Sequence, residues 1–74
     1  MKKLKSEYMI EFSKNLNSLV KTTTVADLSA GTGISHQAIY RYLKCTREIT
    51  LENLCKIADY FDEDLNFLVG RKQY

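Results

Sequence analysis

Apolar residues recur every three or four positions along most of this chain, which is the period of an α-helix. Toward the N-terminus this spacing joins Met9, Phe12, Leu16, Leu19 and Val20. Ser6 followed by Glu7 is a start signal for a helix, so the pattern predicts a first helix over Ser6–Lys21. No proline interrupts the chain, and no stretch has the alternation expected of a strand.

Thr24 is predicted to begin a second, shorter helix. Its side-chain oxygen can accept a hydrogen bond from an N–H of the first turn, and Asp27 lies where the helix dipole favours negative charge. This helix is predicted from Val25 to about Gly31, after a very short link. Gly33 follows, and a glycine there can adopt a positive φ and reverse the chain without steric cost.

Ser35 is suited to cap a third helix directly after this turn, and that helix is predicted to extend to Lys44. Its inner stripe consists of Ile39, Tyr42 and Leu43. Its opposite face carries His36, Gln37, Tyr40, Arg41 and Lys44. A short helix with hydrogen-bond donors and a cation on its outer face, set at an angle by a glycine turn, has the shape of a major-groove reader.

Two more helices are predicted after the caps Thr50 and Asp64. The first has an apolar stripe made of Leu51, Leu54, Ile57, Ala58 and Phe61. The second runs over 65–69 and ends before Gly70, which occupies the usual C′ position. The prediction is therefore an all-α, compact five-helix bundle that forms a single domain over residues 1–74. Its expected core is Phe12, Leu16, Leu28, Ile39, Leu54, Ile57 and Phe67.

Composition narrows the classes of function. The chain has 74 residues, which leaves no room for a deep substrate cavity, and its apolar content of 45% is sufficient for a core. The net charge of +2 is only mildly basic, although three lysines lie in the basic N-terminus 1–5. This N-terminus and the tail 71–74 are expected to lie outside the helices.

No chemistry of catalysis or metal binding is predicted. The two cysteines and one histidine do not have zinc-ligand spacing, and no nucleophile has a base beside it. Asp62, Glu63 and Asp64 lie together, but in a turn where a capping role is the simpler interpretation. We therefore expect a protein that is not an enzyme and that uses no cofactor and no metal. No membrane span or signal peptide is recognisable, so a cytoplasmic protein with reduced thiols is expected.

The order of these motifs resembles the Cro and phage-repressor (XRE-like) class of helix-turn-helix regulators. The resemblance rests on GIS followed by Ile39 and Tyr42, then on LENLCKIADYF and LNFLVG, and it extends from about Phe12 to Gly70. The combination in this order, with short spacings, is specific to the class. It implies a lambda-repressor-like DNA-binding domain in which the second and third helices form the DNA-reading motif. It also implies binding to double-stranded operator DNA, usually as a homodimer on a palindrome.

The resemblance assigns base reading to His36, Gln37 and Arg41. A glutamine can pair bidentately with adenine and an arginine with guanine, and each good pair is worth ~1–3 kcal/mol of discrimination. His36 can also be an ordinary surface residue. Tyr40 shares this face and either touches DNA or packs on a neighbouring helix. Contacts to phosphates are expected from Thr24, Ser35, Lys44, Thr46 and Arg47.

The chain departs from the family pattern at several positions. Val25 stands where the family has a glutamine that binds a phosphate. Val20 and Leu43 stand where many relatives have an arginine–glutamate pair, and we predict that these two apolar side chains touch. Cys45 replaces the usual glycine after the reading helix, so it must adopt a left-handed conformation or the chain must leave the helix differently.

Two functions fit these residues. The leading hypothesis is a transcriptional repressor, of phage or bacterial type, that occupies a promoter. The alternative is an anti-repressor or antitoxin-like module that binds another regulator or a toxin protein, with Tyr8, Tyr40 and Tyr60 as exposed contact residues. On the first hypothesis a homodimer is expected. Its contacts are expected in the turn between the last two helices and in the C-terminal segment 65–74.

Overall fold

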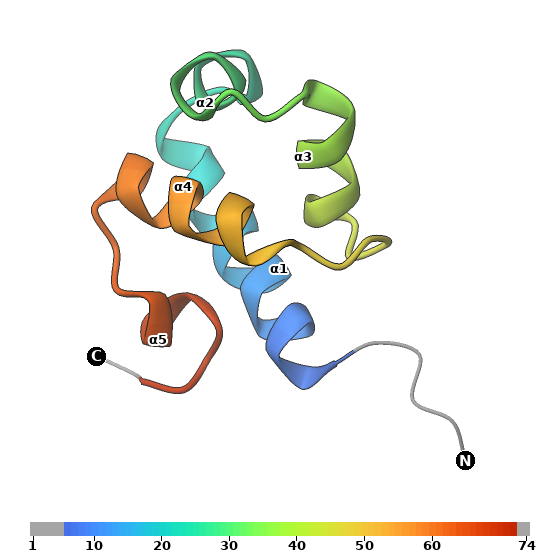
Figure 1. Cartoon of the computed structure of the whole chain (residues 1–74), viewed down its shortest axis with the longest axis vertical. Helices are drawn as coiled ribbons and strands as arrows, with labels where there is room; N and C mark the ends of the chain where they lie inside the picture. Colours follow the sequence, from blue (N-terminus) through green and yellow to red (C-terminus); the bar gives the residue numbers. More distant parts are fainter. Residues whose placement is uncertain (1–5, 73–74) are drawn as a thin grey trace.

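The computed structural model describes residues 6–72, and every regular element in that range is helical. The elements are α1 (Glu7–Leu19), the 3-10 turn η1 (Val20–Thr22), α2 (Val25–Thr32), α3 (His36–Leu43), α4 (Leu51–Phe61) and α5 (Leu65–Leu68). Figure 1 shows α2 and α3 at one end of the molecule, α4 crossing in front of α1, and α5 at the other end. The predicted all-α fold with five helices is confirmed.

Each α-helix begins with the side-chain cap that the sequence predicts. In each case the cap oxygen accepts a hydrogen bond from a backbone N–H of the first turn, which would otherwise have no partner inside the helix. The five pairs of cap and donor are Ser6 and Met9, Thr24 and Asp27, Ser35 and Ala38, Thr50 and Asn53, and Asp64 and Asn66.

Four helix C-termini differ slightly from the prediction. The first helix was expected to reach Lys21, but the chain tightens into η1 after Leu19 because the Thr22 hydroxyl donates to the Leu19 carbonyl oxygen at 2.7 Å. This local donor satisfies a carbonyl that a longer α-helix would have used. Of the other three ends, α2 runs one residue further, to Thr32. The end of α3 lies at Leu43, one residue before the predicted Lys44, and α5 stops one residue earlier, at Leu68.

Within residues 6–72, four residues with positive φ turn the chain after the ends of helices. Gly33 (φ 78°) and Gly70 (φ 83°) lie at the predicted turns after α2 and α5. Cys45 (φ 58°) and Asp62 (φ 54°) adopt the same left-handed region without being glycines, which costs a side chain roughly 1–2 kcal/mol. Of the two exits that the sequence left open after α3, the chain therefore takes the left-handed one.

The core lies between α1, α3 and α4 and is closed by α2 and α5. Its buried apolar residues within 6–72 are Met9, Phe12, Leu16, Leu28, Ile34, Ala38, Ile39, Tyr42, Ile57, Ala58 and Leu68. Of the predicted core, Leu54 and Phe67 are only partly buried and pack against its edge. In α5 the fully buried residue is Leu68 and not Phe67.

Two residues of α4 differ from the prediction. Leu51 was placed in the inner stripe, but 74% of its surface is exposed, because it is the first residue of α4 and lies at the edge of the bundle. The alternative function requires Tyr60 to be exposed, but Tyr60 packs against the core and its hydroxyl lies 3.0 Å from the Thr23 hydroxyl. A Cβ built on Gly31 would lie only 2.5 Å from Cε1 of Tyr60, so the absence of a side chain at Gly31 is what admits this ring.

Candidate nucleic-acid interface

The two faces of α3 differ sharply in burial. Ala38, Ile39 and Tyr42 are buried. The residues predicted to face DNA are all exposed: His36, Gln37, Tyr40, Arg41 and Lys44. Their spacing of one, three and four residues brings them onto one face of a helix of about two turns. The structure therefore brings the predicted base readers together, with Tyr40, 49% exposed, beside them.

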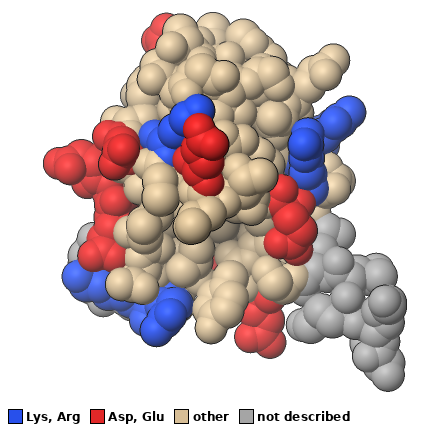
Figure 2. Space-filling view, in the orientation of Figure 1, with Lys and Arg blue, Asp and Glu red and all other residues tan. Residues whose placement is uncertain are grey.

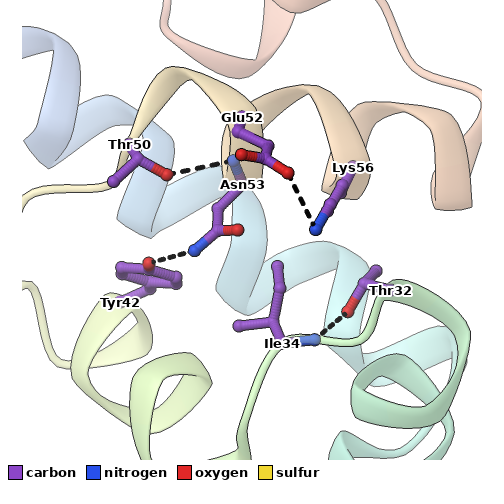
Figure 3. Close-up of polar contacts among 7 residues, drawn as sticks. All are labelled: Thr32, Ile34, Tyr42, Thr50, Glu52, Asn53 and Lys56. Carbon is purple, nitrogen blue, oxygen red and sulfur yellow. Dashed lines mark hydrogen bonds and ion pairs between the residues drawn. The ribbon is translucent and has the colours of Figure 1, made fainter.

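The turn before α3 is held by three hydrogen bonds, two of them buried. The Thr32 hydroxyl donates to the Leu28 carbonyl at 2.7 Å and accepts from the Ile34 N–H at 3.2 Å (Figure 3). The Ser29 hydroxyl donates to the Ile34 carbonyl at 2.6 Å. Ile34 itself is buried. These contacts, together with the left-handed Gly33, therefore fix the orientation of α3 relative to α2.

The N-termini of α2 and α3 carry the two predicted phosphate contacts with hydroxyl groups. Thr24 and Ser35 are exposed, and their oxygens accept from the N–H groups of Asp27 (3.0 Å) and Ala38 (3.1 Å). Each helix start also presents free backbone N–H groups and the positive end of the helix dipole, which together favour anions. Contact of these two residues with phosphate stays a prediction.

The cations next to the outer face are unpaired within residues 6–72. Arg41, Lys44 and Arg47 are exposed, and none of them is within ion-pair distance of a carboxylate of that range. Figure 2 shows basic side chains at the edge of the molecule near α3, with an acidic side chain directly below them, and a separate group of acidic side chains near the end of α4. Thr46 closes the end of α3, because its N–H and hydroxyl both donate to the Arg41 carbonyl, at 2.9 and 3.3 Å.

A helix-turn-helix family model matches residues 21–68, which is more than half of the chain. The chain belongs to the helix-turn-helix family. The match includes α2 and α3, the predicted reading motif, and confirms the Cro and phage-repressor class that the sequence indicates. This family consists of DNA-binding regulatory domains. No curated protein and no solved structure matches the chain.

This helix-turn-helix protein lacks one anchor of its class. Val25, at the position of the phosphate-binding glutamine, is half-buried and packs against the core. Val20 and Leu43, which replace the arginine–glutamate pair, also pack against the core, and their direct contact stays a prediction. Val25 therefore contributes to core packing, and the phosphate contact that the resemblance implies at this position is not expected here.

Three polar side chains that support α3 were missed at the sequence level. Ser13 and Asn17 of α1 both donate to the carbonyl oxygen of Leu43, and Asn53 of α4 donates to the hydroxyl of Tyr42. Asn17 carries a signal, because asparagine inside a helix is unfavourable unless its side chain forms a hydrogen bond. The partner itself depends on tertiary packing and cannot be read from local sequence.

The described part of this helix-turn-helix protein has neither a metal-binding cluster nor a membrane-spanning helix. Residues 6–72 contain no group of three His, Cys, Asp or Glu side chains placed to hold a metal ion. Among the helices of that range, none combines the length and apolar character needed to cross a bilayer.

Proposed function

We propose that this protein is a sequence-specific transcriptional repressor that lays α3 in the major groove of operator DNA. The observation that carries the proposal is the exposed face of α3, which presents His36, Gln37 and Arg41 from a helix whose other face is core. The major groove is about 12 Å wide and admits such a helix. Repression would follow from occupying a promoter, without chemistry.

The side chains of this face would divide the reading between them. Gln37 offers an amide that can pair with both N6 and N7 of adenine, and Arg41 offers two parallel N–H donors for guanine O6 and N7. His36 adds one donor or acceptor in the first turn. Tyr40 would lie against a thymine methyl or a phosphate.

Phosphate contacts would surround these readers at both ends of α3. Thr24 and Ser35 would present the starts of α2 and α3, while Lys44, Thr46 and Arg47 would meet the backbone beyond the end of α3. Because Val25 is turned into the core, each protomer would make one phosphate contact fewer than a relative with glutamine there.

Binding would require two copies, because one helix of eight residues reads only a few base pairs. Two-fold symmetric helix-turn-helix dimers bind half-sites about 34 Å apart, which corresponds to roughly 10 base pairs. We propose a homodimer that joins through the turn between α4 and α5 and the tail 65–74, where Leu65 is 39% exposed.

Selection of bound duplexes from a random pool tests this function. We expect a palindromic motif whose half-sites are about 10 base pairs apart, bound far more tightly than random duplex. The competing function is a protein-binding module, which the exposure of Tyr8 (57%) and Tyr40 (49%) favours. A pool without any enriched sequence, together with co-purification of a second regulator or a toxin, would overturn the repressor and support that module.

A further inference from the structure

The last turn of α3 is tied to α1 by two side-chain hydrogen bonds. The Ser13 hydroxyl and the Asn17 amide both donate to the carbonyl oxygen of Leu43, at 3.0 and 2.9 Å. Leu43 is the final residue of α3, so its carbonyl has no partner inside the helix. A carbonyl oxygen has two lone pairs, and here α1 supplies a donor for each.

The two donors lie next to each other on α1. Ser13 is 6% exposed, and Asn17, which is exposed, lies one helical turn beyond it on the same face of the helix. The Asn17 amide also donates to the Ser13 carbonyl oxygen at 2.8 Å, which holds the amide in place for Leu43. Two neighbouring side chains of one helix therefore converge on a single atom at the end of another.

Arg41 and Lys44 lie close to Leu43 in the sequence, one before it and one after it. Arg41 is in the last turn of α3, and Lys44 is the residue that follows Leu43. A bidentate contact to guanine requires two N–H donors to align with two acceptors at once, so a small tilt of this turn weakens it. Such a tilt affects a phosphate contact less, because a lysine reaches phosphate as a flexible point charge.

We propose that Ser13 and Asn17 are positioning residues for DNA reading, and that they set the angle at which the last turn of α3 presents Arg41 to a base. The proposal rests on α3 being the reading helix. It assigns a role in sequence specificity to α1, which carries none of the side chains expected to touch bases.

The test compares Asn17→Ala with a matched control on the same helix. The Asn15 amide donates to the carbonyl oxygens of Phe67 and Leu68, at 3.1 and 3.0 Å, so it ties the end of α5 as Asn17 ties the end of α3. Both substitutions remove one amide and two hydrogen bonds from α1. Only Asn17→Ala removes a hydrogen bond to the end of α3.

The measurement is binding by each variant to the duplex that the wild-type protein selects from a random pool, and to its single-base-pair variants. We expect Asn17→Ala to lose about tenfold of its discrimination at the base pair where Arg41→Ala also loses it. The double variant Asn17→Ala/Arg41→Ala should lose no more there than Arg41→Ala alone, because the two residues act through one contact. Asn15→Ala should lower the unfolding temperature and leave discrimination unchanged.

Ser13→Ala and Asn17→Asp extend the test. Ser13→Ala should reproduce part of the loss, and Asn17→Asp should exceed Asn17→Ala, because a carboxylate cannot donate to the Leu43 carbonyl and would oppose it. Unchanged discrimination at every base pair in Asn17→Ala, with a sequence still selected by the wild-type protein, would overturn the positioning role alone. A wild-type protein that selects no sequence would overturn the proposed function and this inference with it.

Discussion

The side-chain amide of Asn53 on α4 donates a 2.9 Å hydrogen bond to the hydroxyl of Tyr42 on α3 (Figure 3). Tyr42 is 1% exposed, and its ring meets the ring of Phe12 edge-on, with centroids 6.4 Å apart. One side chain of α3 thus contacts α1 through its ring and α4 through its hydroxyl. The inner face of α3 is therefore held by both neighbours while its outer face stays open.

Tyr42→Phe should lower the free energy of unfolding by about 1 kcal/mol. It keeps the ring but leaves the Asn53 amide without its partner, and an unmade hydrogen bond in a half-buried place costs about this much. Urea denaturation measures the change. Tyr40→Phe is the control, because it removes the same hydroxyl from an exposed position and should alter stability by less than about 0.5 kcal/mol. Equal losses in the two variants would contradict the role of the bond.

Gly31→Ala should destabilise the protein although alanine favours helices. The new Cβ would lie 2.5 Å from Cε1 of Tyr60, so the ring must shift away from its contact with the Thr23 hydroxyl. Overpacking of this kind costs ~1–3 kcal/mol, against a gain in helix propensity of about 1 kcal/mol. We expect a net loss of about 1 kcal/mol in urea denaturation.

The sign of this effect should reverse when the ring is absent. In a Tyr60→Ala background the added Cβ of Gly31→Ala meets no ring, so only the propensity gain remains and the second substitution should stabilise the protein. Destabilisation by Gly31→Ala in both backgrounds would show that the close contact between α2 and α4 is not the cause.

Asp64 should make stability depend on acid. Its pKa is lowered chiefly because its carboxylate accepts a hydrogen bond from the Asn66 N–H, at 2.7 Å, with the Lys72 ammonium also nearby at 3.5 Å. Because the pKa is lower in the folded state, the carboxylate stabilises the fold above its unfolded pKa of about 3.9, and this is lost as the pH falls through the folded pKa. The stability difference between wild type and Asp64→Asn should therefore be largest near pH 7 and shrink below about pH 4. A difference that stays constant with pH would contradict this role.

Lys44→Ala should weaken binding to all DNA sequences alike. Each lost phosphate contact lowers the slope of log K against log salt by roughly one unit, without changing base preference. Lys56→Ala is matched in charge, but Lys56 is already paired with Glu52 at 3.2 Å on α4 and should leave the slope unchanged. Fluorescence anisotropy titrations between low and moderate salt measure both variants. Parallel slopes for wild type and Lys44→Ala would remove Lys44 from the backbone contacts.

Local rules predict much of this fold from sequence. A cap needs only one side chain and the N–H groups two or three residues later, so all five helix starts were correct. The outer face of α3 was equally predictable, because burial of Ile39 and Tyr42 fixes which side of a short helix faces outward.

Contacts between distant residues could not be predicted in the same way. Nothing near Tyr60 in the sequence shows that its ring is packed and not exposed. The ring packs between helices only because Gly31, on α2, has no side chain. Leu51 fits the apolar spacing of α4 but lies at its first residue, where no other helix covers it. Likewise, the sequence shows that Asn17 is unusual in a helix, whereas its partner Leu43 is 26 residues away.

The reading of bases by α3 is tested most directly by Arg41→Ala on a panel of single-base-pair variants of the selected duplex. The wild-type protein should lose affinity at a G·C pair in each half-site when that pair is replaced. Arg41→Ala should lose about tenfold or more of this discrimination at that pair and keep its preferences at the others. A base-preference profile that is identical for wild type and Arg41→Ala at every position would contradict base reading by this helix.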